Sequence, residues 1–293
     1  MRETIKRILY TWILPPGVLY VLKWWIWNGV RCRHFSTLNT YCPSSRKLFV
    51  LATGPSLTID QEKYKSDIAD NDVLVMNQFV ESDVFERIRP EIYLLVDMLY
   101  FRDLDLLQPI VREKMERLRE ALLRKVRWPM VLIVPDVAKE SDLLNVIKGN
   151  SCIKVVYYNS RPPLAYNRIG LFLLSKGYVS PPAQTVACVA ACLGVLLKYD
   201  EIWMLGIDTS MHTMMRVDQK TNEMYIENSH FYGKKREPIF NAGNPAKASY
   251  WLGCASRMLA GYEVVRKLAD YSGVHVINAT SFSWVDSLER AER

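Results

Sequence analysis

The sequence predicts an α/β domain built on a mostly parallel, Rossmann-like sheet with helices on both faces. Two observations predict it. Short runs of β-branched and large apolar residues alternate along the chain with longer, helix-periodic segments. Many of these runs are apolar throughout instead of at alternate positions, which is typical of strands buried on both faces of a parallel sheet. A chain of 293 residues is also long enough to bury a core of this kind.

The expected elements follow one another in a regular order. We expect strands at 48–52, 73–76, 92–96, 130–134, 152–158, 201–205 and, last, 274–278. We expect helices at 111–126, 139–148, 185–198 and 247–272. The stretch 160–182 is interpreted as an excursion from the sheet, and so is 209–228, which with residue 229 is interpreted as a lid. Residues 48–293 then form one domain, preceded by a polar linker at 36–47 and a separate segment at 1–35.

The charge of the chain is concentrated at its start. The formal net charge is +7, and residues 1–47 alone carry eight basic side chains and one acidic one, whereas residues 48–293 carry 30 of each sign. A nucleic-acid-binding protein would carry its basic surplus on the folded domain, so we exclude nucleic acid as a partner. Six cysteines without CxxC spacing and only four histidines argue against a zinc site and favour a reducing compartment.

Residues 1–35 favour association with a membrane surface. Between residues 8 and 30 the only charge is Lys23, and four of the eight tryptophans lie there. Pro15-Pro16-Gly17 interrupts the run, and basic residues flank it on both sides. This pattern fits a broken helix pair lying in one leaflet, peripheral or monotopic, on the cytoplasmic face of the inner membrane. A spanning helix, or a helix packed on the domain or in a homo-oligomer contact, remains an alternative.

Polar residues follow several of the expected strands, and ligands of parallel sheets bind at the carboxyl ends of strands. They are Thr53-Gly54-Pro55-Ser56, Asn77-Gln78 and Gly206-Ile207-Asp208. Glycine allows a ligand to approach the backbone, while Ser56 could cap a helix or donate to a phosphate. An amide side chain can read the edge of a base or a sugar. Each motif also has a structural interpretation as an ordinary turn or strand end.

His230, within Asn228-Ser229-His230-Phe231-Tyr232-Gly233, is the best single candidate for a catalytic group. It follows a polar segment, and the pKa range of an imidazole suits a general base. Asp103 and Asp105 match a DxD pattern that can hold a divalent metal, but two acids in a first helical turn are ordinary dipole complements. We therefore predict no metal and no cofactor.

The order of these motifs resembles a known enzyme family. Strand–GPSL, NQF, GID and NSHFYG, spread over residues 48–278, are similar to motifs of the bacterial sialyltransferases of glycosyltransferase family 42 and related lipopolysaccharide and capsule enzymes. The resemblance implies a GT-A-like variant of the Rossmann-like fold, a CMP-activated sialic acid or another nucleotide sugar as donor, no metal, and a glycan or lipid-linked acceptor. It implies that His230 is the base on the acceptor hydroxyl and that a loop after GID closes over the donor.

The resemblance also implies a set of donor-binding residues, with Thr53 standing where the family commonly has asparagine. They are Thr53, Gly54, Pro55, Ser56, Asn77, Gln78, Thr185, Gly206 and Asp208. Two lid tyrosines that stabilise the departing phosphate in the family have no counterpart in this chain. Ser210, His212 and Arg216 are available in their place, and a cation there could neutralise the phosphate.

Two other functions remain open. A pyrophosphokinase-like enzyme would carry a similar strand–GPS turn, use ATP and magnesium, and take Asp97, Asp103 and Asp105 as metal ligands. A non-catalytic membrane-bound module would dock a partner of a glycan assembly complex and bind no nucleotide.

Overall fold

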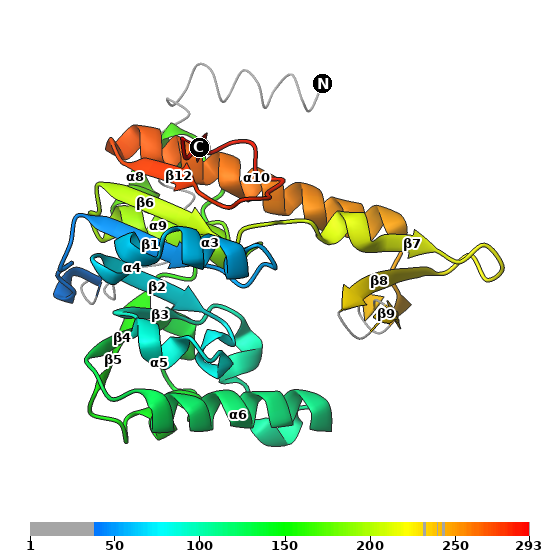
Figure 1. The fold of residues 1–293 in the computed structure, drawn as a ribbon, viewed down its shortest axis with the longest axis horizontal. Coiled ribbons are helices and arrows are strands. Elements are labelled where there is room, and N and C mark those ends of the chain that lie inside the picture. Colours follow the sequence, from blue (N-terminus) through cyan, green and yellow to red (C-terminus); the bar gives the residue numbers. More distant parts are fainter. Residues whose placement is uncertain (1–37, 231–232, 239, 242–243, 293) are drawn as a thin grey trace, which may run out of the picture.

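The computed structural model describes residues 38–230, 233–238, 240–241 and 244–292. Its centre is an eight-stranded sheet with the order β13-β12-β6-β1-β2-β3-β4-β5 (Figure 1), in which every strand pair is parallel. The strands are β1 (Lys47–Leu51), β2 (Asp72–Met76), β3 (Ile92–Leu94), β4 (Met130–Pro135), β5 (Ile153–Tyr158), β6 (Glu201–Leu205), β12 (His275–Asn278) and β13 (Glu289–Arg290). The predicted parallel α/β architecture is confirmed.

Helices cover both faces of this sheet. The α-helices are α3 (Leu57–Lys63), α4 (Lys65–Ala69), α5 (Phe85–Ile88), α6 (Pro109–Lys125), α7 (Asp142–Ile147), α8 (Arg168–Ser175), α9 (Val186–Leu196) and α10 (Ala248–Ser272). Short 3-10 helices are η2 (Leu38–Thr40), η3 (Phe79–Glu81), η4 (Met98–Phe101), η5 (Leu104–Leu106), η6 (Asp136–Ala138) and η7 (Met211–Met214).

Alternate residues of each strand enter two separate cores. In β1, Leu48 and Val50 pack with α8, α9 and α10, whereas Phe49 and Leu51 pack with the layer that contains α5, α6 and α7. This is the physical reason why the strands are apolar at every position: each face of the sheet is covered by its own helical layer.

Helix α9 packs close to the sheet because its residues are small. A Cβ on Gly194 would lie 2.7 Å from Ile202 Cδ1 and 3.0 Å from Leu48 Cδ2. Thr185 begins the helix, and its hydroxyl oxygen accepts a hydrogen bond from the amide of Ala187 at 3.3 Å. The prediction of a closely packed helix after Thr185 is confirmed.

Two predictions need correction. The stretch 160–182 contains α8, whose Leu171, Leu173 and Leu174 are buried in a core. The strand at 274–278 is not the last, because the two-residue strand β13 pairs with it at the sheet edge. The segment 209–228 leaves the central sheet as predicted, and it forms η7, β7 (Met215–Val217) and most of β8 (Met224–His230).

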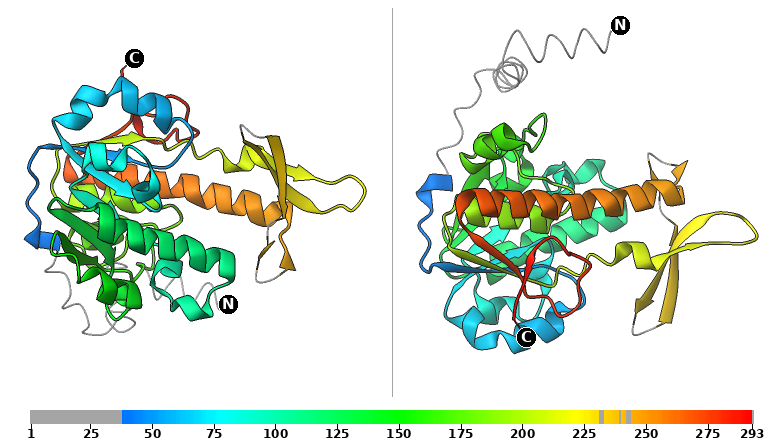
Figure 2. Two further views of the ribbon diagram at one scale, coloured as in Figure 1. Left: turned by 60° about the horizontal axis from the view of Figure 1, so that its bottom comes forward. Right: turned by 90° about the horizontal axis from the view of Figure 1, so that it is seen from above.

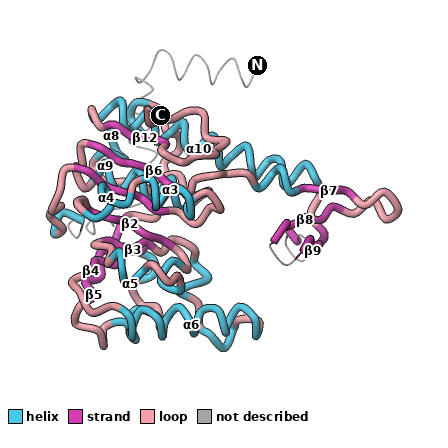
Figure 3. Tube along the Cα trace, in the orientation of Figure 1, coloured by secondary structure: helices cyan, strands magenta, loops and turns pink. Residues whose placement is uncertain are grey.

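A small antiparallel sheet stands away from the main body. It consists of β7, β8 and β9 (Gly233–Pro238), followed by the short pair β10 (Phe240–Asn241) and β11 (Asn244–Pro245). Figures 1 and 2 show it beside the N-terminal end of α10, on the side toward which the central strands point, and Figure 3 shows that strands and loops make up this projection.

The residues before β1 are fixed to the domain where the structure describes them. Leu38 is buried in the core, and the Lys154 ammonium donates to the carbonyl of Thr40 at 3.1 Å. The predicted membrane segment, 1–35, lies outside the described residues. None of the helices in the described ranges combines the length and the apolar character that a bilayer-spanning helix requires.

Candidate functional site

The strand order reverses between β1 and β6. From β1 the chain adds β2 to β5 on one side, and from β6 it adds β12 and β13 on the other. Ligands of open α/β sheets bind outside the carboxyl ends of the strands at such a switch point. The Gly54 turn follows β1 and the Gly206 turn follows β6, so two of the predicted motifs meet there.

The two turns are clasped together. The Gly54 amide donates to the Gly206 carbonyl at 3.0 Å. A Cβ on Gly54 would overlap both that carbonyl oxygen and the carboxylate of Asp208. Gly206 has φ +68°, a conformation that side-chain-bearing residues rarely adopt. Both glycines are therefore required by the close approach of the two turns.

Asp208 holds the first turn in place. Its Oδ1 accepts hydrogen bonds from the Ser56 hydroxyl at 2.6 Å and from the Ser56 amide at 3.2 Å, and the side chains of both residues are buried. The suggestion that Ser56 caps the following helix through its side chain is wrong, because α3 has no such bond. Ser56 and Asp208 thus form the base of the candidate site, and Thr53 and Pro55, in the same turn as Ser56, are exposed.

A second buried carboxylate supports the base of the site. Asp60, on α3, is fully buried, and its Oδ2 accepts the Gly206 amide at 3.2 Å. Its Oδ1 accepts the amide and the hydroxyl of Ser281 at 2.9 and 2.5 Å. The sequence interpretation missed both residues, since an acid in a first helical turn is ordinary and the partner lies 221 residues away.

Asn77 and Gln78 form an amide–hydroxyl cluster beyond β2. Gln78 Nε2 donates to the Tyr100 hydroxyl at 2.9 Å, and that hydroxyl donates to Asn77 Oδ1 at 3.4 Å. Burial raises the pKa of Tyr100 to about 12, so it remains a neutral donor at ordinary pH. Asn77 has φ +55°, which asparagine tolerates, and its carbonyl accepts the Tyr93 hydroxyl.

Thr185 is linked through Tyr262 to Thr209, the residue that follows Asp208. The hydroxyl of the fully buried Tyr262 hydrogen-bonds with the side chains of Thr185 and Thr209, and burial raises the pKa of this tyrosine well above its usual range. Thr209 is the residue after Asp208 and has φ +52°, which is unfavourable for a β-branched side chain. The chain thus leaves the sheet through a strained residue.

The residues predicted to form a lid have partners of their own. Arg216 Nε lies 3.7 Å from Glu227 Oε2 across the β7–β8 pair, and its Nη1 donates to the Thr213 carbonyl at 2.9 Å. The Ser210 carbonyl accepts the Thr213 amide at 2.9 Å. The His212 ring packs edge-on against Trp284, with ring centroids 4.5 Å apart. His212 Nδ1 is buried without a hydrogen-bond partner in the described part of the chain.

His230 lies at the tip of the small sheet. It is the last residue of β8, and its Cα pairs with that of Gly233, the first residue of β9. The backbone of this histidine, which follows the segment predicted to be a lid, belongs to a strand. Residues 231–232 of the same motif lie outside the described residues.

The acids considered as metal ligands have structural partners. Asp97 Oδ1 accepts the Leu99 amide at 2.9 Å, and Asp103 Oδ1 accepts the Asp105 amide at 3.0 Å, each at the start of a 3-10 helix. Asp105 pairs with Arg112 at 2.8 Å. Within the described residues, no group of three or more His, Cys, Asp or Glu side chains is placed to hold a metal ion.

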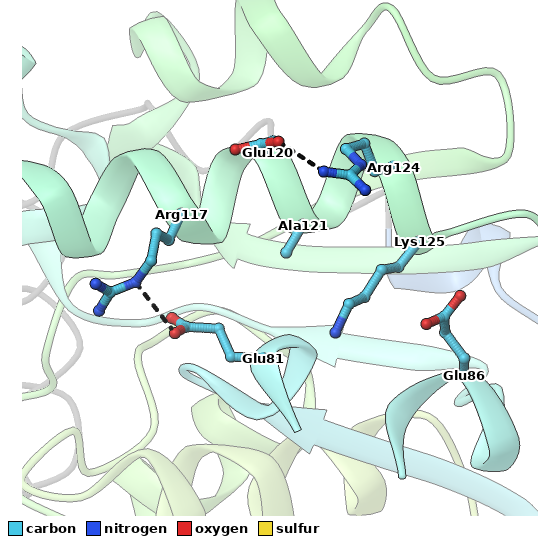
Figure 4. A pocket seen from close by; sticks show the side chains of 7 residues that line it. All are labelled: Glu81, Glu86, Arg117, Glu120, Ala121, Arg124 and Lys125. Atoms are coloured by element: carbon cyan, nitrogen blue, oxygen red, sulfur yellow. Dashed lines mark hydrogen bonds and ion pairs between the residues drawn. The ribbon is translucent and has the colours of Figure 1, made fainter. Parts of the chain in front are cut away.

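A charged hollow of about 390 Å³ lies between α6 and the segment 81–86 (Figure 4). Four of its charged residues pair with one another, Arg117 with Glu81 at 3.5 Å and Arg124 with Glu120 at 2.9 Å, and Lys125 donates to the Val80 carbonyl at 2.8 Å. None of the residues predicted for the site lines it. We therefore assign it no role in the candidate site.

Comparison with known proteins finds a likeness among solved structures. No family model matches the sequence, and no significant match is found among the curated proteins. Among solved structures, the chain is similar to the MAf glycosyltransferase from Magnetospirillum magneticum AMB-1, with 12% identity and a TM-score of 0.48. The alignment covers 89% of this chain and 38% of that one, so this chain spans well under half of that protein's length.

Proposed function

We propose that this chain is a glycosyltransferase that moves a sugar from a nucleotide-sugar donor, preferably a CMP-sugar, to a hydroxyl of a glycan or lipid-linked acceptor. The observation that carries the proposal is the clasp of Gly54, Gly206 and Asp208 at the switch point of the sheet. It joins two of the motifs that resemble glycosyltransferase family 42, and the Asn77 motif follows the neighbouring strand.

The donor would lie across the clasp. Thr53 and Pro55 are exposed there, and the glycine between them lets a phosphate approach the backbone. Asn77 and Gln78 are oriented by Tyr100 and would read the base or the ribose. A neutral tyrosine and two amides favour recognition by hydrogen bonds over recognition by charge.

The chemical step would use the small sheet. His230 would accept the proton of the acceptor hydroxyl while its oxygen forms a bond to the anomeric carbon of the donor sugar. The bond from that carbon to the phosphate oxygen breaks, and the nucleoside phosphate leaves with the electron pair. Arg216 or His212 would stabilise the developing charge in place of the family's lid tyrosines. Residues 1–35 would hold the enzyme at the cytoplasmic face of the inner membrane, near lipid-linked acceptors.

The proposal is tested by nucleotide binding to the full chain in detergent. We expect CMP to raise the melting temperature without magnesium; a ligand at 100 times its Kd adds about 2.7 kcal/mol of stability. CDP, UDP, GDP, ADP and ATP, each with and without magnesium, complete the panel. Stabilisation only by ATP with magnesium would instead support the pyrophosphokinase-like function. A protein that no nucleotide stabilises would contradict the proposal and support a binding module.

The base assignment is tested by His230→Ala. We expect transfer to fall about 10²–10⁴-fold, with the CMP-induced shift in melting temperature unchanged. The matched control is His275→Ala, because His275 is exposed and lies at the amino end of β12, whereas the candidate site lies at the carboxyl ends of the strands. Transfer at a near wild-type rate in His230→Ala would show that another group is the base.

A further inference from the structure

The loop that follows β12 presents two aromatic rings to solvent. Phe282 is 59% exposed and Trp284 is 45% exposed. The two serines of the same stretch are bonded to the domain: Ser281 donates to Asp60 at 2.5 Å and Ser283 donates to the carbonyl of Ile207 at 2.6 Å. Large aromatic rings are mostly buried in folded proteins.

The loop is fixed in this conformation. Asn278 Nδ2 donates to the Val285 carbonyl at 3.0 Å, and the Thr280 amide donates to Asn278 Oδ1 at 3.2 Å. The side chains of Asn278 and Thr280 are fully buried. Both aromatic rings are therefore carried on a backbone that is held from both ends, so the exposure does not come from a loosely attached loop.

The same loop borders the candidate site. The Trp284 amide donates to the Asp208 carbonyl at 3.0 Å, and the Phe282 carbonyl accepts from the Ser56 hydroxyl at 3.3 Å. His212, from the predicted lid, packs against Trp284 with the two rings nearly perpendicular and their centroids 4.5 Å apart. The two rings thus lie next to the clasp, at the point where the lid meets the sheet.

We propose that Phe282 and Trp284 form an aromatic shelf that binds the pyranose ring of a sugar substrate. Isolated exposed aromatics are common on protein surfaces, but two of them on one fixed loop beside the clasp are not isolated. The C–H face of a pyranose is apolar and its rim is polar, which suits exposed rings surrounded by hydroxyls and backbone groups. This inference rests on the proposed glycosyltransferase function.

The sugar fits this position better than the nucleobase does. The shelf lies on the β12 side of the switch point, whereas the amides that suit a base, Asn77 and Gln78, lie on the β2 side. The shelf's pyranose could belong to the donor or to the acceptor, and its chemistry is the same in both cases.

The test is saturation-transfer NMR on the full chain in a detergent without a sugar headgroup. The probes are the methyl pyranosides of glucose, galactose, N-acetylglucosamine and N-acetylneuraminic acid, and CMP-sialic acid. We expect ring-proton signals from at least one probe with the wild-type protein. Phe282→Ala and Trp284→Ala should abolish these signals. Phe172→Ala should retain them, since Phe172 on α8 is equally exposed, at 45%, and belongs to another part of the surface.

The variants Trp284→Phe and Phe282→Leu keep an apolar side chain and serve where an alanine variant fails to fold. We expect them to weaken pyranoside binding about 3- to 10-fold without changing the CMP-induced shift in melting temperature. If a bound methyl pyranoside survives saturation with CMP-sialic acid, the shelf holds the acceptor sugar. If it is displaced, the shelf holds the donor sugar.

Either of two results with the sugar probes would overturn the shelf: no pyranose signal from the wild-type protein, or signals that persist in both alanine variants. Loss of CMP binding in folded shelf variants would also overturn it, because the rings would then stack on the base. Failure of the proposed function has a different signature, in which no nucleotide stabilises the wild-type protein whatever the sugar probes show.

Discussion

Two buried aspartates lie at opposite ends of the central strands, Asp72 at the amino end of β2 and Asp208 beyond the carboxyl end of β6, and they serve different purposes. Asp72, at the start of β2, is 1% exposed and accepts the Ser44 amide at 2.9 Å and the hydroxyls of Tyr41 and Tyr199 at 3.2 and 2.5 Å. Asp208, beyond β6, is 5% exposed and accepts the amide and hydroxyl of Ser56. For both carboxylates these donors are neutral groups.

The difference is in what surrounds each carboxylate. Around Asp72 are Tyr41, which is partly buried, and Tyr199, which is fully buried, and burial raises the pKa values of both. Their bonds to Asp72, with those of Ser44, attach residues 41–44 to the sheet. Around Asp208 are a glycine, two residues of positive φ and an exposed aromatic loop. The same kind of hydrogen bonding packs the chain tightly at the amino ends of the strands, whereas at the carboxyl ends it holds turns whose residues Thr53 and Pro55 stay exposed.

The largest effects should come from replacing each aspartate. We expect Asp72→Asn and Asp208→Asn each to lower the free energy of unfolding by about 2–3 kcal/mol, because buried donors lose a charged acceptor. Only Asp208→Asn should also weaken CMP binding, by at least about 10-fold. Urea denaturation and CMP titration of the two variants check this. Equal loss of CMP affinity in Asp72→Asn would contradict the placement of the nucleotide at the carboxyl ends of the strands.

A glycine pair gives an effect of intermediate size. Gly54→Ala should destabilise the fold by about 1–3 kcal/mol, as overpacking does, and should weaken CMP binding because the clasp must open. Gly253→Ala, inside α10, should stabilise by about 0.5–1 kcal/mol, since its Cβ would meet only the flexible Arg257 side chain, at 3.4 Å. Thermal unfolding with and without CMP measures both. A Gly54→Ala variant with wild-type stability and affinity would remove the clasp from the site.

The smallest effect concerns the titration of Glu91, which lies near Asp72 at the amino ends of the strands. Burial raises the pKa of Glu91, whose Oε2 accepts the Val73 amide at 2.7 Å. Its contribution to stability is therefore complete below the unfolded pKa of about 4.3 and is lost as the pH rises through the higher folded pKa. Relative to wild type, Glu91→Gln should become more stable as the pH rises from 4 to 7.

Glu201 is the matched control for that titration. The indole of Trp203 donates to its carboxylate at 2.9 Å and lowers its pKa, with Lys47 acting in the same direction. Glu201→Gln should therefore lose stability relative to wild type over the same rise in pH. Denaturation midpoints at four pH values suffice, and slopes of the same sign for the two variants would contradict the assignment.

Much of the fold could be predicted because its strands are buried on both faces. The runs at 48–52 and 201–205 are apolar at nearly every position, and both are strands in the structure. Burial of this kind leaves a local signature in the sequence. The turns after these strands could be predicted for the same reason, since a glycine or a polar residue must follow where the apolar run ends.

What could not be predicted depends on contacts between distant residues. Asp60 has the appearance of an ordinary acid in a first helical turn. Its burial depends on its hydrogen bonds to Ser281, which lies 221 residues away in the sequence. Phe282 and Trp284 alternate with serines, a pattern that says nothing about which side faces solvent. The strands β7 and β8 were not predicted because they lack the continuous apolar runs that mark the strands of the central sheet. They pair with each other outside that sheet, and charged side chains such as Arg216 and Glu227 meet across them.

The strand order also has a consequence for how the chain assembles. Strands β1 to β5 are contiguous in sequence and in space, whereas β6 joins β1 only after about 150 residues and β12 follows about 70 residues later. Contacts of such long sequence separation form late, because loop closure must precede them. The clasp and the aromatic loop lie on this seam. A nascent chain that ends after β5 can carry five of the eight strands and the turns with Gly54 and Asn77, but it lacks Gly206, Asp208 and the aromatic loop. The appearance of nucleotide binding during refolding would therefore report the pairing of β6 with β1.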